Sequence, residues 1–422
     1  MKNKRFLGAV DVTKQLLNDV IFMCESRRKP TYFTRSGGKL SFKNTILFSL
    51  FFVKKSIQLE LEDFFDRLNL SDEGITKQAY SEARQKISPS AFITLTLAVL
   101  QWFYEHHDFK TFYGYRLCAI DGSVFEIHNT EQLRDHFGYI HNQSITCARA
   151  QVSCIYDIEN NLVIASKIAP YRTGERALAK GLIQDLKKLG LKNDLILFDR
   201  GYPSKHFIAY MEQNDLKYVM RVPLSSMREL KETTQSDQVI TFSVDGETVT
   251  ARVLRFELSS GEEEILVTNL MEENLGVQDF KELYFKRWGI EKEYDVMKNK
   301  LEIENFTGST PIAVEQDFYA SVYLTNMVAL LENEVTERIQ QANEGKGLKH
   351  EYKANTNFVI GKLKHSLVLL LLESSPRKRL RRFDQLMRSL VKKKTPIRNG
   401  RSYKRNKVIT SNKFSRNRKR CL

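Results

Sequence analysis

Residues 195–202 read LILFDRGY: four apolar residues are followed directly by an aspartate, an arginine and a glycine. A short apolar run that ends in a turn signal is typical of a fully buried strand. Asp199 closes this run, so its side chain can emerge at the end of the strand, where sheet proteins gather their ligands. The segment therefore predicts a sheet with a polar site at one edge.

The residues around this segment alternate between strand and helix patterns. We expect helices at 175–189 and in a stretch ending near residue 210, and strands at 116–127, 151–156, 162–168, 195–198 and 217–222. The DIENN stretch at 157–161 is a hairpin turn by composition. Three adjacent strands followed by alternating helices and strands predict a mixed α/β sheet with helices packed on it.

The apolar spacing divides the chain into five parts. Helical spacing before residue 110 predicts an N-terminal helical domain, and its polar helix at 77–86 suits a DNA phosphate backbone as well as it suits a solvated surface. The expected domains are the helical domain 1–110, a sheet domain of 111–222 and 271–310, a β-rich insertion 223–270, C-terminal helices 311–376 and a basic tail 377–422.

Positive charge is concentrated at the C-terminal end. The chain has a net charge of +15, and residues 377–422 contain 19 Lys and Arg and one acid, which leaves −3 for the rest. A segment this basic favours binding to nucleic-acid phosphates, with a solubilising or disordered tail as the alternative.

Cysteine spacing and the length of the apolar runs indicate the cellular compartment of the protein. The five cysteines form no C-x-x-C pair and indicate reduced thiols in a cytosolic protein. We expect no signal peptide and no membrane insertion, because apolar runs such as 367–372 are far shorter than the roughly 20 residues that cross a bilayer. The expected location is the cytoplasm, near the nucleoid.

Three carboxylates occupy positions that suit a site on such a sheet. Asp121 falls in the first predicted strand, Asp199 closes the buried strand, and Glu291 lies on a predicted helix at 278–301. Clustered carboxylate oxygens suit Mg²⁺ or Mn²⁺, and a pair of such ions would promote phosphodiester chemistry. Each acid also has an ordinary alternative, respectively a hairpin turn, a strand stop and an exposed helix charge.

The helix around Glu291 strengthens the catalytic interpretation. Tyr284, Arg287, Glu291 and Lys298 share a stripe of roughly 60° at about 100° per residue. Such a stripe suits a metal ligand flanked by phosphate contacts, with Arg287 binding an oxygen pair and Lys298 acting as a point charge. Tyr284 would bond a phosphate or stack on a base. A solvated, salt-bridged helix is the alternative.

Two other charged residues have less specific interpretations. Arg200 follows Asp199 and would contact DNA or pair with an acid. Glu175 begins a predicted helix, where the helix dipole is an adequate explanation for an acid.

The spacing Tyr284-x2-Arg287-x3-Glu291-x6-Lys298 resembles the Y-x2-R-x3-E-x6-K signature of the insertion-sequence-four family of bacterial DDE transposases. DGS at 121–123 and DRGY at 199–202 resemble the first and second aspartate motifs of that family, and the order Asp, Asp, β insertion, Glu is also the same. The resemblance covers about residues 116–308. The N-terminal helices resemble the family only loosely, and the basic tail hardly at all.

This resemblance implies a ribonuclease-H-like catalytic domain that binds two Mg²⁺ ions, or Mn²⁺, through Asp121, Asp199 and Glu291. It further implies a homodimer that pairs two transposon ends. The tryptophan-bearing insertion of some members is not matched, since the only tryptophans are Trp102 and Trp288.

The expected activity is cleavage of DNA at the terminal inverted repeats of a transposon, followed by transfer of the 3′-hydroxyl into target DNA. Such a reaction needs positioning and charge rather than a covalent enzyme intermediate. The alternatives are a domesticated, non-catalytic DNA-binding protein and a nuclease of the same fold that does not join strands.

Overall fold

The computed structural model describes residues 4–34, 37–51, 53–70, 74–141, 146–190, 193–258 and 261–398. The chain divides into two compact units, and each is described by itself. We call them the helical unit, Met1–Asp108, Val124–Ala150 and Val296–Leu422, and the sheet unit, Phe109–Ser123 and Gln151–Asp295.

The helical unit contains most of the helices of the described chain. These are α1 (Arg5–Leu17), α2 (Val20–Ser26), α3 (Phe42–Ser49), α4 (Ile57–Arg67), α5 (Lys77–Arg84), α6 (Ser90–His106), α7 (Glu131–Phe137), a π-helical turn (Val296–Lys300), α13 (Pro311–Asn343), α14 (Thr356–Leu372) and α15 (Pro376–Val391). The short strands β2 (Tyr139–His141), β10 (Tyr352–Ala354) and β11 (Lys394–Pro396) complete it.

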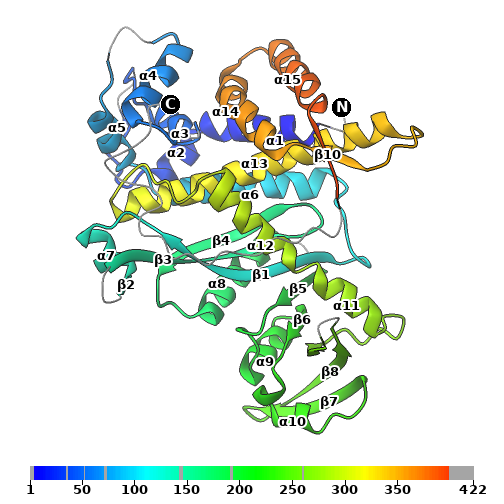
Figure 1. The fold of residues 1–422 in the computed structure, drawn as a ribbon. Helices are drawn as coiled ribbons and strands as arrows, with labels where there is room; N and C mark the ends of the chain where they lie inside the picture. The colour runs from blue at the N-terminus through cyan, green and yellow to red at the C-terminus, as the bar shows by residue number, and fades with distance from the viewer. Residues whose placement is uncertain are drawn as a thin grey trace. The chain divides into compact units, whose positions relative to one another are not determined.

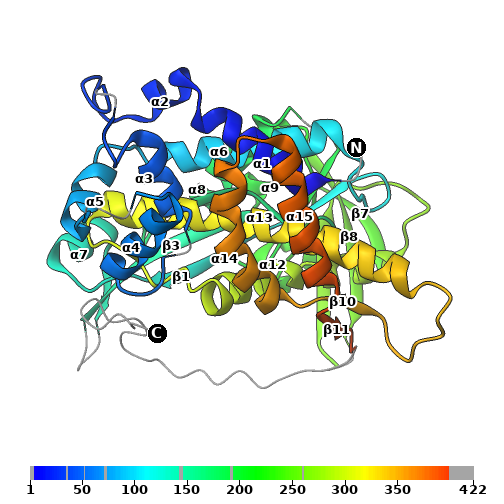
Figure 2. The same ribbon diagram turned by 90° about the horizontal axis from the view of Figure 1, so that it is seen from above.

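Helix α13 is the centre of the helical unit. Thr310 caps it by accepting a hydrogen bond from the Ala313 N–H, and Pro311 supplies a first residue whose backbone is already suited to a helix. Its buried side chains lie on all sides, which is typical of a helix enclosed by other helices. Helices α1, α6, α14 and α15 pack against it (Figure 1), and α14 and α15 lie side by side along it (Figure 2).

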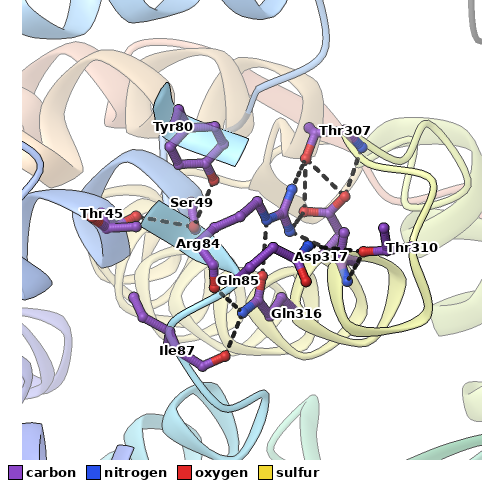
Figure 3. A network of polar contacts seen from close by, with 11 residues as sticks. Thr45, Ser49, Tyr80, Arg84, Gln85, Ile87, Thr307, Thr310, Gln316 and Asp317 are labelled. Atoms are coloured by element: carbon purple, nitrogen blue, oxygen red, sulfur yellow. Dashed lines mark hydrogen bonds and ion pairs between the residues drawn. The ribbon is translucent and has the colours of Figure 1, made fainter. Parts of the chain in front are cut away.

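A buried arginine joins α5 to α13 (Figure 3). Arg84 is 2% exposed, and its guanidinium donates to Gln316 Oε1 at 2.8 Å, Thr307 Oγ1 at 2.6 Å, the Ala313 carbonyl at 3.0 Å and Asp317 Oδ1 at 2.7 Å. One face of the helix at 77–86 is therefore structural, while the exposed side chains on its other face are available to solvent or a ligand.

The sheet is mixed, with strand order β3-β1-β5-β6-β9-β8-β7, and both β2 and β4 pair with β3. Its further strands are β1 (Arg116–Glu126), β3 (Thr146–Asp157), β4 (Leu162–Pro170), β5 (Asp194–Phe198), β6 (Lys217–Arg221), β7 (Asp237–Val244), β8 (Glu247–Glu257) and β9 (Glu263–Thr268). β5 is parallel to β1 and β6, whereas β6, β9, β8 and β7 are successively antiparallel.

Hydrogen bonds at both ends of β1 show that β3 runs antiparallel to it. The Leu117 carbonyl accepts from the Ile158 N–H at 2.9 Å, and the Ile127 N–H donates to the Ala148 carbonyl at 3.5 Å. All five residues of β5 are buried, as expected of a parallel strand covered on both faces. The predicted fold, a mixed α/β sheet with N-terminal and C-terminal helices, is confirmed.

The sheet unit also contains helices. They are α8 (Glu175–Lys187), α9 (Lys205–Gln213), a 3₁₀ turn (Leu224–Ser226), α10 (Arg228–Lys231), α11 (Val277–Phe285) and α12 (Trp288–Asp295). Helix α8 packs on β4, and α9 packs on β6 and β7. The buried apolar side chains of these elements form one core under the sheet.

The structure differs from the sequence-based expectations in three segments. Strands β7–β9, expected as a separate insertion, extend the main sheet because β9 pairs with β6. The single helix expected at 278–301 is divided into α11, α12 and the π-helical turn.

The expected basic tail begins as helix α15, because Phe383, Leu386, Met387 and Leu390 give it an apolar face that is buried. Residues 399–422 of that tail lie outside the described residues. Within the described ranges, every helix is too short or too polar to cross a lipid bilayer.

A buried ion pair fixes the start of the central strand pair. Arg116 and Asp194 are register partners on β1 and β5, and the guanidinium donates to the carboxylate at 2.6 and 2.9 Å. Arg116→Met should lower the free energy of unfolding by about 3–5 kcal/mol in urea titrations, because it leaves Asp194 buried without its partner.

The double variant Arg116→Met/Asp194→Leu should recover most of that loss. As a control, Arg228→Met breaks the exposed pair with Glu232 and should cost less than about 1 kcal/mol. Equal losses in the two single variants would contradict a structural role for the buried pair.

Candidate active site

Two aspartates meet at one edge of the sheet because of strand register. Ile120 on β1 pairs with Phe198 on the parallel strand β5. The residue that follows each of them in the chain is an aspartate. Asp121 and Asp199 therefore follow equivalent positions on neighbouring strands. This is the edge at which parallel sheets bind ligands, so the sequence-based placement of both residues agrees with the structure.

Arg287 brings the third carboxylate to the same place. Its guanidinium lies 3.1 Å from Glu291 Oε1, 3.8 Å from Asp199 Oδ2 and 4.0 Å from Asp121 Oδ2. The Arg287 side chain is only 3% exposed. A single buried cation thus lies among three acids that come from strand β1, the residue after β5 and helix α12.

The local backbone at Arg287 departs from an α-helix. Helix α11 ends at Phe285 and α12 begins at Trp288. Between them the Arg287 N–H donates to the Tyr284 carbonyl at 3.0 Å, and the Ile290 N–H donates to the Arg287 carbonyl at 3.2 Å, so the turn is tighter than an α-helical one. Sequence spacing did not predict this break.

Burial and charge act in opposite directions on these groups. Burial raises the pKa of Asp121 to about 6, while a hydrogen bond from the Gly122 N–H at 2.8 Å and the nearby Arg287 act to lower it. For Arg287, burial acts to lower the pKa, but Tyr284 and the surrounding carboxylates raise it above its ordinary value. The guanidinium therefore remains charged within the cluster.

Tyr284 supports the end of β5. Its hydroxyl lies 3.3 Å from the Phe198 carbonyl oxygen and 3.4 Å from Asp199 Oδ1, and burial raises its pKa. The Arg287 guanidinium lies over the Tyr284 and Trp288 rings, 5.7 and 5.5 Å from their centroids. Tyr284 is thus placed to orient Asp199 and Arg287.

Two hydroxyls that the sequence interpretation missed hold the backbone at Asp121. Tyr294 Oη and Ser153 Oγ donate to the Asp121 carbonyl at 2.9 and 3.1 Å. Tyr294 lies three residues after Glu291 and so shares its side of α12, which is the one signal that sequence spacing offered.

The remaining predicted residues have different surroundings. Lys298 belongs to the helical unit, where its ammonium donates to the Val124 carbonyl at 2.7 Å, lies 3.9 Å from Glu304 and sits over the Phe125 ring. It falls in the π-helical turn, whereas the predicted stripe was calculated for a continuous α-helix. Arg200 is exposed.

The donor chemistry of this edge fits a divalent cation. Asp121, Asp199 and Glu291 present hard oxygen atoms and outnumber the one buried cation, Arg287. In the arrangement described, however, no three His, Cys, Asp or Glu side chains of the described residues lie close enough together to hold one ion. Arg287 provides the balancing positive charge there.

Comparison with known proteins identifies related chains. Residues 112–327, slightly more than half of the chain, match the family model described as "Transposase DDE domain". The curated protein "Putative transposase InsZ" of Escherichia coli (strain K12) is 23% identical over 172 residues, covering 36% of this chain and 53% of the relative. The match therefore spans about half the length of that relative.

A cryo-EM structure of a piggyBac transposase synaptic complex with hairpin DNA aligns with 90% of this chain and 85% of its own. The TM-score of this alignment is 0.47, at 12% sequence identity.

Removal of the central cation should expose the repulsion among the three acids. We expect Arg287→Ala to lower the free energy of unfolding by about 3 kcal/mol in a chelating buffer, because buried charge is left without its partner. Mg²⁺ should stabilise this variant more than the unchanged protein, since the ion supplies the lost charge.

Thermal and urea unfolding with and without Mg²⁺ measure both effects. Lys292→Ala, at an exposed position of α12, is the control and should change neither quantity appreciably. If Arg287→Ala is as silent as Lys292→Ala, the guanidinium does not balance the cluster.

Proposed function

Because this chain belongs to the transposase DDE domain family, we propose that it cleaves DNA at transposon ends and transfers the freed 3′-hydroxyl into target DNA. The observation that supports this most strongly is the meeting of Asp121, Asp199 and Glu291 around one buried guanidinium. These carboxylates come from separate elements and meet at the end of parallel strands. This arrangement is more typical of a site for phosphodiester chemistry than of a structural ion pair.

The residues at this edge have separate roles in the proposed reaction. Asp121, Asp199 and Glu291 would hold two Mg²⁺ ions, or Mn²⁺. When bound, these cations stabilise charge on the phosphate oxygens as Lewis acids. Tyr284 keeps Asp199 oriented through its hydroxyl.

Arg287 has hydrogen-bond donors that can bind a phosphate. Its Nε and Nη1 atoms are buried and make no hydrogen bond within the described residues, while Nη2 bonds Glu291. A phosphate oxygen is the acceptor that a guanidinium recognises best. We therefore propose that Arg287 binds both the carboxylates and the DNA backbone. Further candidate DNA contacts are Arg200, which is exposed, Tyr284 and Lys298.

The finer family assignment rests on the signature residues. Tyr284, Arg287, Glu291 and Lys298 have the spacing of the insertion-sequence-four family, and we propose that the chain is a member. By this assignment, a homodimer would pair the two terminal inverted repeats. Such a protein would act on chromosomal DNA in the bacterial cytoplasm, at the nucleoid.

Helix α15 gives the helical unit a DNA-binding surface. Arg377, Arg381 and Arg388 are exposed and lie within roughly 40° of one another around the helix. The opposite, apolar face of α15 is buried against the protein, so it is not available to insert into a membrane. A row of arginines on a solvent-facing helix suits the DNA phosphate backbone.

Loss of any one carboxylate should abolish cleavage. We expect Asp121→Asn, Asp199→Asn and Glu291→Gln each to reduce cleavage of labelled terminal-repeat DNA by at least about a thousandfold with Mg²⁺, because charge stabilisation dominates this chemistry. Binding of the same DNA should persist.

The products of the DNA assay distinguish three possible functions of the protein. Cutting with joining supports a transposase, cutting alone a nuclease, and binding alone a non-catalytic DNA-binding protein. Near-normal cleavage by one of the three variants would remove that residue from the active site.

Replacement of the α15 arginines should change the salt dependence of DNA binding. In Arg377→Gln/Arg381→Gln/Arg388→Gln, the slope of log K against log salt should fall by about 0.9 for each phosphate that the protein no longer neutralises. The weakening should be similar for terminal-repeat and random-sequence DNA, because phosphate contacts carry no sequence information.

The matched control replaces Lys188, Arg228 and Lys231, three exposed cations of the sheet unit, with glutamine. It lowers the net charge equally, so a difference between the two triple variants reports position rather than overall charge. An identical slope in both would remove α15 from the DNA interface.

A further inference from the structure

A fourth carboxylate lies beside the glycines that follow the two aspartates. Glu175 is the first residue of α8, and its carboxylate occupies the space next to two glycines. A Cβ atom on Gly201 would lie 2.6 Å from Glu175 Oε2, and one on Gly122 would lie 3.2 Å from Glu175 Oε1. The carboxylate thus lies against strand β1 at Gly122 and against the loop after β5 at Gly201.

Both glycines lie close in sequence to the catalytic aspartates. Gly122 directly follows Asp121, and Gly201 follows Asp199 by two residues. Neither glycine is among those with positive φ. Backbone conformation therefore does not explain them. A Cβ atom on Gly201 would meet the Glu175 carboxylate first, and one on Gly122 would meet both Gln151 Nε2, at 2.9 Å, and Glu175 Oε1.

Helix α8 is fixed in this position by the neighbouring residue. Arg176 donates from Nε to the Tyr202 carbonyl at 2.9 Å and from Nη2 to the Pro203 carbonyl at 3.1 Å. These bonds tie the first turn of α8 to the loop that follows Asp199. The helix dipole accounts for an acid at this position, but not for a carboxylate that lies beside both Gly122 and Gly201.

A buried hydroxyl independently indicates a ligand at this place. Tyr202 is 1% exposed, and its hydroxyl makes no hydrogen bond of normal geometry within the described residues. Burial raises its pKa, and Asp121, Glu175 and Asp199 raise it further, while the nearby Ser153 hydroxyl acts in the opposite direction. The Tyr202 N–H donates to the Asp199 carbonyl at 3.2 Å, so Tyr202 belongs to the turn that carries Asp199. A buried polar atom without a partner is costly unless a ligand or water satisfies it.

We propose that Glu175 is a fourth acidic residue of the cation site, acting with Asp121 and Asp199. This inference rests on the proposed function for the presence of a divalent cation there. Four carboxylates against the buried Arg287 leave an excess of negative charge, and hard oxygen ligands of this kind favour Mg²⁺ and Mn²⁺. Glu175 would hold the ion directly or through one of the waters that these ions retain.

Mn²⁺ binding to the full-length protein without DNA tests this role. Glu175→Gln keeps the shape of the side chain and removes its charge, and it should weaken Mn²⁺ binding by about 10- to 100-fold in calorimetric titrations. Glu247→Gln, at an exposed position in the β7–β8 hairpin, makes the same change outside the site and should leave the affinity unchanged. Thermal unfolding in a chelating buffer checks that both variants are folded.

A second variant moves the carboxylate without removing it. Gly201→Ala places a methyl group against Glu175 Oε2 and should also weaken Mn²⁺ binding, since the carboxylate must shift. The double variant Gly201→Ala/Glu175→Gln should lose little more affinity than Glu175→Gln alone, because both changes act on one interaction.

Unchanged Mn²⁺ affinity in Glu175→Gln, or fully additive losses of affinity in the double variant, would overturn the assignment. If Glu175→Gln does not fold, the Gly201→Ala titration decides: weaker binding supports the role, and normal binding overturns it. DNA cleavage is a separate assay. A chain that binds Mn²⁺ through Glu175 but cuts no DNA would uphold this inference while the proposed function failed.

Discussion

The arrangement of the polar edge depends on one interaction, the partial neutralisation of three carboxylates by the buried Arg287 guanidinium. Parallel pairing of β1 and β5 places Asp121 and Asp199 beside each other, and α12 adds Glu291. Like charges at this spacing repel, and burial already raises the pKa of Asp121. A cation among them lets the acids remain together, and that grouping is the property a metal-dependent enzyme needs.

The supporting residues form a frame that holds the charged groups of that cluster in place. Tyr284 holds Asp199, and Tyr294 and Ser153 hold the backbone of Asp121. The tight turn between α11 and α12 carries Arg287 itself. Each of these contacts fixes a group that would otherwise move away from its neighbours, so the frame pre-organises the edge before any substrate arrives.

The sequence alone predicted the mixed sheet and its polar edge because both depend on local patterns. The buried strand at 195–198 and the aspartate that ends it are visible in eight residues. The division of the late helix was not predictable, because calculated spacing assumes a uniform helical period and Val296–Lys300 is π-helical. The sequence interpretation attributed Glu175 to the helix dipole alone, because its position beside Gly122 and Gly201 joins segments distant in sequence.

The central claim is that this edge of the sheet binds divalent cations at Asp121 and Asp199. Anomalous diffraction from crystals grown with Mn²⁺ tests it most directly, since the ion is located without reference to activity. The account predicts anomalous density within coordination distance, about 2.0–2.2 Å, of Asp121 and Asp199 oxygens. Density only at other acidic residues, or none at this edge in crystals with saturating Mn²⁺, would contradict it.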